Sequence, residues 1–406
     1  MILWQNISEF LALRRNTSLL LVALVLAGTG EKLWLGFAPK YIQTLGGGIW
    51  VIGVYDALQT LLGAVYAYPG GWLTDRWGQR RSLLLFSLIS VAGYFMVQLW
   101  HHWMALLLGS FFFLAWSALS LPATFSIVAT SLQRHRHTMG MGVQSLVRRV
   151  PMLLGPLIGG WLLTRYGWTD GVRYALALCI ALSLLTLGFQ WFLFEPDKPG
   201  RRQGGKSHSE VAVAPTFFTI VKNFTPALRE LLVSDILIRF CERIPYAFVI
   251  LWAMDSGGVT AQQFGYLVAL EMVTAMACYL PVAHFADKYG RRPFVLATFV
   301  FFTLFPLSLL WAHDFRWLAL AFVVRGLKEF GEPARKALIL GEALPDQRAR
   351  TYGAYYLLRD STVTTGSFLG AWLWSVSPQA NFIGAAVCGA LGTLWFGWFV
   401  CRNPRG

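Results

Sequence analysis

Two polar stretches organise this sequence: GWLTDRWGQRR at residues 71–81 and AHFADKYGRR at residues 283–292. Each combines an aspartate, a glycine and several basic residues, and long apolar runs flank it on both sides. A short basic loop between apolar runs is typical of a cytoplasmic connection in a membrane protein. The two stretches therefore predict paired membrane helices at two corresponding places in the chain.

The composition also predicts a membrane protein. Of the 406 residues, 56% are hydrophobic and 13% are charged, and the mean hydropathy is +0.53, which exceeds what a water-soluble globular chain tolerates. Several apolar runs approach or exceed the roughly 20 residues that cross a hydrocarbon core. With the loop charges they predict twelve transmembrane helices, near residues 18–44, 49–74, 81–100, 103–130, 138–164, 172–194, 228–254, 261–286, 292–312, 316–342, 350–375 and 380–401.

The second half of the chain repeats the first at an offset of about 211 residues, as expected of a duplicated architecture. Corresponding positions include Glu31-Lys32 and Glu242-Arg243, Pro122 and Pro333, Arg148 and Arg359, and Gly155/Gly159 and Gly366/Gly370. A stretch rich in Pro, Gly, Ser, Lys and Arg separates the halves. We expect an all-α membrane protein of two pseudo-symmetric six-helix bundles, residues 1–194 and 226–406, joined by a cytoplasmic linker at 195–225.

Both loop stretches resemble the cytoplasmic loop signature of the major facilitator superfamily, and span number, loop position and duplication extend the resemblance over the whole chain. The second copy departs at Ala283, where the family has glycine. The resemblance implies that family's fold, with two halves that rock about a midplane site. It also implies gating roles for Asp75, Arg76, Arg80, Asp287, Lys288 and Arg292. The alternative for the arginines is that they only set the topology.

The sequence GPLIGG at residues 155–160 has two interpretations. It resembles the glycine-proline motif of family members that export drugs by antiport. Small residues at this spacing are also typical of close helix packing. The repeat of the glycine pair at Gly366 and Gly370 favours this second interpretation. The fourth expected span lacks the arginine that many proton-coupled members carry, since residues 108–111 read LGSF.

Charged residues inside the expected spans are the second indication of function. An ionised side chain at the bilayer centre costs at least about 2.5 kcal/mol, so such residues must be paired, hydrated or functional. The candidates for a central cavity and for proton coupling are Glu31, Lys32, Asp56, Asp235, Glu242, Arg243, Glu329 and Glu332. The candidates for substrate binding are Arg148, Arg359, Arg325 and Lys328. Glu31 and Glu242 are the first candidates for proton binding because they occupy pseudo-symmetric positions. Arg148 and Arg359 are the first candidates for binding an anionic group of the substrate, because a guanidinium suits carboxylate or phosphate.

Some of these charges also admit a purely structural interpretation. Arg239 with Asp235 and Glu242 has the helical spacing of ion pairs, and so does Arg325 with Glu329. The charged residues from Arg325 to Lys336 fall within an arc of roughly 120° if the helix is continuous. For the group as a whole we favour transport, because a purely structural core is often at least as stable when it is apolar.

The net charge of +14 is distributed over alternate loops, which argues against a nucleic-acid partner. By the positive-inside rule both termini are cytoplasmic, and the same residues can contact anionic membrane lipids. We therefore expect a multi-pass protein of the inner (plasma) membrane.

Our prediction is a secondary active transporter, coupled to protons, that moves a small polar or amphipathic organic solute by alternating access and acts as a monomer. The motif at 155–160 favours a drug or metabolite exporter, whereas the charged spans favour import of an organic anion or zwitterion. A non-transporting sensor or a membrane-embedded enzyme on this fold stays a rival. The sequence contains no GxSxG or HExxH motif, so we expect no enzyme, metal or cofactor.

Overall fold

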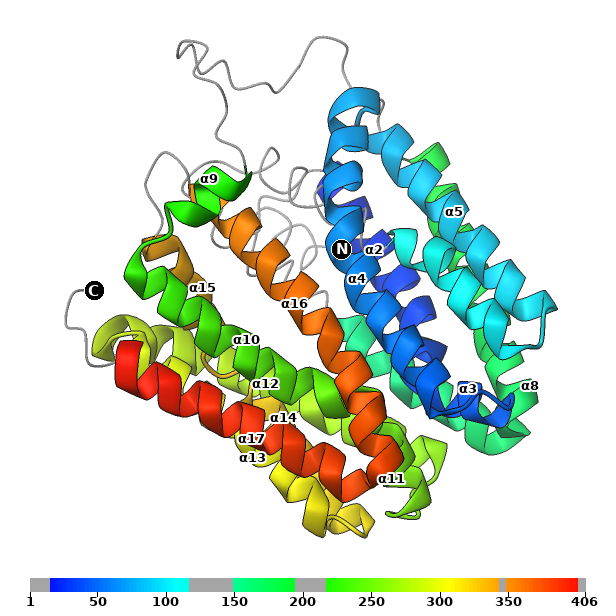
Figure 1. Ribbon diagram of the computed structural model, residues 1–406. Helices are drawn as coiled ribbons and strands as arrows, with labels where there is room; N and C mark the ends of the chain where they lie inside the picture. Colours follow the sequence, from blue (N-terminus) through cyan, green and yellow to red (C-terminus); the bar gives the residue numbers. More distant parts are fainter. Residues whose placement is uncertain (1–14, 117–148, 194–216, 343–347, 401–406) are drawn as a thin grey trace, which may run out of the picture. The chain divides into compact units, whose positions relative to one another are not determined.

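The computed structural model describes residues 15–116, 149–193, 217–342 and 348–400, which form helices joined by turns (Figure 1). No strand occurs within these ranges. The chain divides into two compact units: unit 1 comprises Met1–Gly46 and Leu62–Gly205, and unit 2 comprises Gly47–Leu61 and Lys206–Gly406. Helix α4 (Ile49–Trp77) contributes to both, because its residues up to Leu61 belong to unit 2.

Unit 1 is built on the packing of α2 against α8. Its described elements are α2 (Arg15–Trp34), η1 (Leu35–Phe37), α3 (Ala38–Thr44), the rest of α4, α5 (Gln79–Leu99), an apolar helix at Trp103–Trp116 and α8 (Arg149–Phe192). The 44 residues of α8 are two helices that meet at a kink at Gly167, where φ is 79°. They correspond to the described parts of the spans expected at 138–164 and 172–194, and the span expected at 103–130 is described as far as Trp116.

Unit 2 is built around α10, which packs against α16 and α17. Its further elements are α9 (Phe217–Lys222), α10 (Pro226–Tyr246), α11 (Val249–Asp255), α12 (Ala261–Tyr289), α13 (Arg292–Trp311), α14 (Phe315–Leu327), α15 (Glu332–Gly341), α16 (Arg348–Val376), α17 (Pro378–Trp395) and η4 (Phe396–Val400). An apolar core that includes Ile238, Phe299 and Phe396 joins α10, α13 and η4. This core holds the charged face of α10 in a fixed orientation.

The continuous helix expected at 316–342 needs correction, because it is interrupted between α14 and α15. The intervening turn is tightened by i→i+3 hydrogen bonds, such as the one from the Phe330 N–H to the Leu327 carbonyl at 3.0 Å. The hydroxyl of Thr298 accepts the Gly331 N–H at 2.5 Å, which satisfies a donor freed by the break. The charged residues between Arg325 and Lys336 therefore do not share one face of a regular helix.

The internal repeat is visible in how glycines pack. A Cβ added to Gly159 would lie 1.8 Å from the carbonyl oxygen of Leu33, and one added to Gly370 would lie 2.2 Å from that of Ile244. Both distances are far below a van der Waals contact, so only glycine fits where α8 crosses α2 and where α16 crosses α10. The motif at 155–160 thus serves close helix packing in this structure.

The two signature loops share a backbone feature that depends on glycine. Gly78 has φ 86° and Gly290 has φ 88°, a region that L side chains rarely adopt. Each glycine lies between two long helices, α4 and α5 in one case and α12 and α13 in the other. The corresponding turns are therefore built in the same way in both halves of the sequence.

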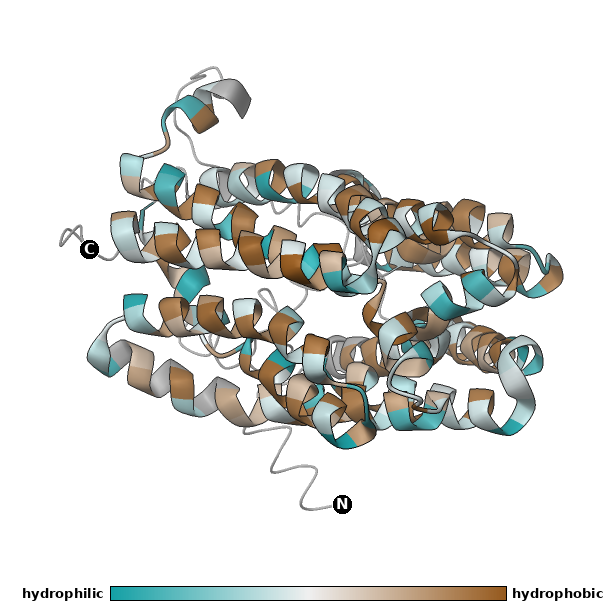
Figure 2. Ribbon diagram, turned by 60° about the horizontal axis from the view of Figure 1, so that its bottom comes forward, coloured by the Kyte–Doolittle hydropathy of each residue, from teal (hydrophilic) through white to brown (hydrophobic). Residues whose placement is uncertain are grey.

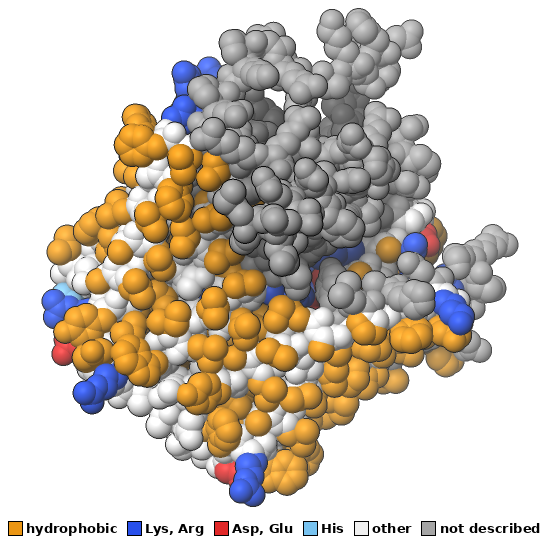
Figure 3. Space-filling view, turned by 180° about the vertical axis from the view of Figure 1, so that it is seen from behind, with side chains coloured by type: hydrophobic (Ala, Val, Ile, Leu, Met, Phe, Trp, Pro, Cys, Tyr) orange, Lys and Arg blue, Asp and Glu red, His pale blue; other side chains and the backbone are white. Residues whose placement is uncertain are grey.

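The apolar surface fits a lipid environment. Six helical segments in the described ranges are long and apolar enough to cross a membrane: Leu21–Thr44, Ile49–Tyr66, Arg80–Leu99, Arg149–Phe192, Arg292–Trp311 and Pro378–Phe399. Apolar residues run along the length of the helices (Figure 2), and hydrophobic side chains cover much of the surface seen in Figure 3. Leu394 and Phe192 are 70% and 82% exposed, which is suited to contact with lipid tails. Helix α10 falls outside the set because charged residues interrupt its apolar run.

We predict that Gly159→Ala destabilises the protein, whereas Gly188→Ala on the same helix does not. A methyl group at Gly159 collides with the backbone of α2, while a Cβ at Gly188 meets nothing within 4 Å. Overpacking of this kind costs about 1–3 kcal/mol. Thermal unfolding of the two variants in detergent checks the expectation, and equal midpoints for both would contradict the packing described for α2 and α8.

Candidate functional site

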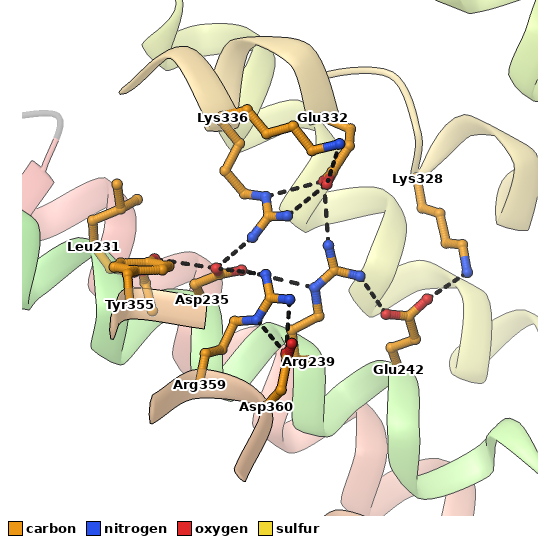
Figure 4. Close-up of polar contacts among 12 residues, drawn as sticks. Leu231, Asp235, Arg239, Glu242, Lys328, Glu332, Lys336, Tyr355, Arg359 and Asp360 are labelled. Carbon is orange, nitrogen blue, oxygen red and sulfur yellow. Dashed lines mark hydrogen bonds and ion pairs between the residues drawn. The ribbon is translucent and has the colours of Figure 1, made fainter. Parts of the chain in front are cut away.

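The most unusual feature of unit 2 is a buried network of charged side chains (Figure 4). It connects α10, α12, α16 and the interrupted span formed by α14 and α15. Five acids and five bases compose it: Asp235, Glu242, Glu271, Glu332 and Asp360, with Arg239, Arg325, Lys328, Arg335 and Arg359. We call this set the charge network.

Asp235, on α10, is its most deeply buried member, with a side chain that is 0% exposed. One of its carboxylate oxygens accepts hydrogen bonds from the guanidinium of Arg335, from the Tyr355 hydroxyl at 3.1 Å and from Arg359 Nη1 at 3.4 Å. Arg239 Nε lies 3.9 Å from the other oxygen. Asp235 thus connects α10 to α15 and α16, and it forms ion pairs with three cations at once.

Glu332 begins α15 directly after the break and binds two arginines. Its carboxylate accepts Arg335 Nη2 at 2.6 Å and Arg239 Nη2 at 3.2 Å. Lys336 Nζ lies 3.7 Å away, but its side chain is 46% exposed and is therefore partly solvated. The break between α14 and α15 places this carboxylate over α10, where Arg239 can reach it.

Glu242 on α10 contacts the residues just before the break, at the end of α14. It accepts hydrogen bonds from Arg239 Nη1 at 2.6 Å and from Lys328 Nζ at 2.7 Å. Lys328 in turn lies 3.9 Å from Glu271 on α12, and Arg325 Nε lies 3.3 Å from the same carboxylate. The helical spacing predicted Glu329 as the ion-pair partner of Arg325, whereas in the structure Arg325 pairs with Glu271 on another helix.

A separate ion pair lies beside the network. Arg243 Nη2 is 2.8 Å from Asp56 Oδ1 and also donates to the Asp56 carbonyl at 2.6 Å. Ser367 donates to the second carboxylate oxygen of Asp56 at 2.6 Å. Asp56 lies in the part of α4 that belongs to unit 2. These bonds attach that half of α4 to α10 and α16.

The charges of the network balance when every member is ionised, because it contains as many acids as bases. Each ion loses several kcal/mol of hydration on burial, and only close partners offset that cost. Protonation of one carboxylate therefore leaves one excess positive charge in a medium that screens it poorly. This makes the network sensitive to any added charge, whether a proton or a charged solute.

A cavity opens at the Glu242 end of the network. It is lined by Glu242, Tyr246, Val249, Phe302, Phe305, Arg325 and Lys328, and has a volume of about 10 Å³. Such a volume accommodates the centre of about one water molecule. An organic solute therefore requires the lining side chains to separate before it can enter. Their chemistry combines one carboxylate, two cations and three aromatic rings.

Aromatic faces hold the cations that line this cavity. The Arg325 guanidinium lies 5.3 Å from the Phe305 ring centre and 5.8 Å from that of Tyr246, and Lys328 Nζ lies 5.6 Å from that of Phe302. Cation–π attraction at these distances is worth about 0.5–2 kcal/mol. The rings offer both apolar area and an electron-rich face to an amphipathic molecule.

The residues expected in unit 1 are arranged differently. Glu31 is 4% exposed and lies 3.1 Å from Lys32, its neighbour in sequence. Arg148, expected to bind substrate, lies outside the described residues. Its counterpart Arg359 is 7% exposed and is engaged with Asp235 and Asp360, so substrate contact by Arg359 would require these pairs to open.

The loop residues expected to gate lie at the helix ends of the two signature loops. Arg76 stacks over Trp72 at 5.2 Å, and Lys288 lies 5.4 Å from the ring of Tyr289. Arg80 donates to the carbonyl of Trp191 at the end of α8. Asp75 and Asp287 lie near the ends of α4 and α12, Arg292 begins α13, and gating by the set stays a prediction.

Several residues of the site were not predicted from the sequence. Tyr355 and Ser367 gave no signal in the sequence, because single hydroxyl groups are common in membrane helices. Tyr355 lies one helical turn before Arg359 and Ser367 two turns after it, so the spacing from a charged residue could have indicated them. Phe302 and Phe305 could not be told from ordinary lipid-facing or core residues.

Comparison with known proteins agrees with this architecture. The sequence profile of the Major Facilitator Superfamily matches residues 20–241 and again 231–406. The chain belongs to the Major Facilitator Superfamily. It is accordingly a multi-pass membrane transporter for small molecules rather than an enzyme, with the fold of two six-helix halves that the sequence predicted.

Relatives and solved structures span the full length of the chain. It is 24% identical to "Multidrug resistance protein MdtG" of Proteus mirabilis, with 97% of each chain covered, and 22% identical to "Multi-drug resistance efflux pump PmrA homolog" of Lactococcus lactis, with 94% of each covered. A nucleoside transporter, NupG, matches with a TM-score of 0.78 at 15% identity, covering 94% of this chain and 99% of that one. A POT family transporter matches with a TM-score of 0.75 at 15% identity, covering 96% of each. The structural matches show the shared fold.

We predict that Asp235→Asn lowers stability by about 3–5 kcal/mol, because it leaves buried arginines without their counter-ion. Asp170→Asn is the matched control, since Asp170 is 63% exposed in its side chain and pairs loosely with Arg173 at 3.7 Å. Thermal unfolding in detergent measures the difference.

The double variant Asp235→Asn with Arg335→Met should recover part of the lost stability, because it removes the orphaned cation along with the anion. If Asp235→Asn unfolds at the same temperature as Asp170→Asn, the charge network does not hold α10, α15 and α16 together.

Proposed function

We propose that this protein is a proton-coupled secondary transporter that exports an amphipathic organic solute by alternating access. The observation that carries the proposal is the charge-balanced network, with its cavity bordered by Glu242, Lys328 and Arg325. The direction of transport is supported by full-length similarity to relatives that are named as multidrug resistance proteins. We assign both proton binding and contact with the solute to Glu242.

The coupling follows from electrostatics. A proton on Glu242 weakens its bonds to Arg239 and Lys328 and adds one positive charge to a neutral, buried set. A cationic solute beside Glu242 adds the same charge, so the two exclude each other. Mutual exclusion at one site means that a cation leaves when a proton arrives, which is antiport.

A second candidate function is uptake of an organic anion or zwitterion together with a proton. The observation in its favour is that two cations but one acid border the cavity. An anion would offset the excess charge that a bound proton creates, so proton and anion would bind together. The same network thus supports antiport of a cation or symport of an anion, and the charge of the solute decides which occurs.

Several features of the proposal concern the protein in its membrane. We place it in the inner membrane as a monomer, with both termini in the cytoplasm and basic loops against anionic lipids. In this orientation the signature loops containing Asp75 and Asp287 lie at the cytoplasmic rim. Their acids and bases then pair differently as the halves rock, which would gate the cavity.

We predict that Glu242→Gln abolishes transport driven by a pH gradient in proteoliposomes. The amide keeps the shape of the side chain but cannot exchange a proton. Glu230→Gln is the control, because Glu230 lies on the same helix and bonds Trp395 Nε1 at 2.8 Å, away from the cavity. Pooled lipophilic cations, organic anions and zwitterions serve as test solutes.

Solute counterflow without a gradient is measured alongside, because it reports alternating access independently of proton movement. Movement of lipophilic cations against a proton gradient supports export, and co-movement of anions with protons supports the second candidate. If wild type and Glu242→Gln respond identically to the gradient, the assignment of Glu242 fails.

A further inference from the structure

Unit 1 contains a buried row of polar side chains to which no role has been assigned. On α5 it comprises Ser87 and Ser90, and on the second part of α8 it comprises Ser183, Thr186 and Gln190. Each of the five is at most 6% exposed. We call this row the polar seam. Hydroxyl and amide groups placed in a membrane interior are costly unless they are bonded, so such a concentration requires an explanation.

The seam is a hydrogen-bonded contact between α5 and α8. Ser87 on α5 donates to Gln190 Oε1 on α8 at 2.8 Å, and Ser90 accepts the backbone N–H of Trp116, at the end of the neighbouring helix Trp103–Trp116, at 2.8 Å. Ser183, Thr186 and Gln190 are spaced three and four residues apart, so they line one face of α8 over about 10 Å. The seam therefore extends along the helix axes.

At its middle the seam encloses a cavity with donors that lack partners. Ala27, Ser87, Ser90, Tyr94, Trp116, Ser183 and Thr186 line a space of about 10 Å³, which accommodates about one water molecule. Trp116 Nε1, a donor of a lining residue, is buried and has no hydrogen-bond partner within the described ranges, and the same holds for Gln190 Nε2, one turn of α8 beyond Thr186. A water molecule in the cavity would accept from Trp116 Nε1 and bond the neighbouring hydroxyls.

One end of the seam reaches Glu31. The Cys179 thiol, one turn of α8 before Ser183, lies against Ser183 and Tyr94 and close to Glu31. Ala27, which lines the cavity, is one turn before Glu31 on α2. The charged and titratable groups near Glu31 in the described residues thus include Lys32 and Cys179, and Tyr94 lies beside Cys179.

A cluster of buried aromatic rings borders the polar seam near Glu31. Trp34, Tyr94 and Phe113 are each at most 2% exposed, and the ring centres of Trp34 and Phe113 are 5.1 Å apart. Tyr94 also lines the cavity, so this aromatic cluster borders the seam, while the polar groups of α8 continue from Ser183 to Gln190 near the end of the helix.

We propose that the polar seam binds water and relays protons between Glu31 and the end of α8 near Gln190, an inference that rests on the proton coupling proposed above. The hydroxyls of Thr186 and Ser90 donate to the carbonyls of Leu182 and Phe113, so each must first turn its hydrogen towards the bridging water. A hydroxyl both donates and accepts, so these groups and Ser183 can then pass a proton without carrying charge themselves. The coupling then uses one carboxylate in each unit, Glu31 for the relayed proton and Glu242 beside the cavity, and gradient-driven transport requires both.

The water is tested first, on the wild-type protein. Millisecond radiolytic hydroxyl labelling modifies side chains that contact ordered water even when they are buried. We expect Trp116 and Tyr94 to be labelled faster than Phe86, which is 0% exposed in an apolar cluster on α5, with each rate divided by that in the denatured chain. Equal relative rates for the three residues would overturn the proposal.

The relay is tested with Ser183→Ala and Thr186→Val, which remove hydroxyls at nearly constant shape. We expect gradient-driven transport to fall at least about 10-fold, equivalent to a barrier increase of about 1.4 kcal/mol, while counterflow without a gradient stays near the wild-type rate. Ser110→Ala is the control, because Ser110 is buried in unit 1 but does not line the cavity.

The outcomes separate this inference from the proposed function. If wild type couples to protons and both variants transport normally, the seam carries no protons although proton coupling stands. If wild type ignores the gradient, proton coupling and the relay both fail. A loss of counterflow in the variants, matched by a loss of thermal stability, would show that the seam is only structural.

Discussion

The pairing of buried charges around Asp235 is the constraint on which unit 2 depends. Asp235 is surrounded by Arg335, Arg359 and Arg239, which come from three helices. None of these ions is stable in a membrane interior alone, so the helices must stay together in an arrangement that pairs all of them. The same requirement makes the network responsive, because one added proton or solute charge upsets the balance that holds it.

The interruption between α14 and α15 allows this arrangement. A regular helix would carry Lys328 and Glu332 on one surface, but the turn directs Lys328 to Glu242 and Glu332 to Arg239. Both units also rely on a glycine at a close helix contact, Gly159 where α8 crosses α2 and Gly370 where α16 crosses α10. The two halves share their framework of glycines and turns, and the division of polar groups between them is unequal.

The sequence predicted the framework because hydropathy, loop charge and an internal repeat report directly on membrane helices. It also predicted the pairs of Arg239 with Asp235 and Glu242, which lie within one helix at regular spacing. It could not predict the bond between Asp235 and Arg335, which joins positions 100 residues apart, nor Glu271 as the partner of Arg325. Such pairs depend on which helices meet, and the break after Leu327 changes the facing residues further.

The central claim, that a neutral buried network couples a proton to a solute charge, can be tested by measuring proton release on binding. Purified protein in weakly buffered detergent solution is mixed with a lipophilic cation, tetraphenylphosphonium, or with an aromatic carboxylate, salicylate, while a pH indicator records the change. At a pH low enough that Glu242 is protonated in part of the molecules, we predict release of protons with the cation, further uptake with the anion, and neither in Glu242→Gln. Binding of either probe without proton exchange, or with the same sign for both, would contradict it.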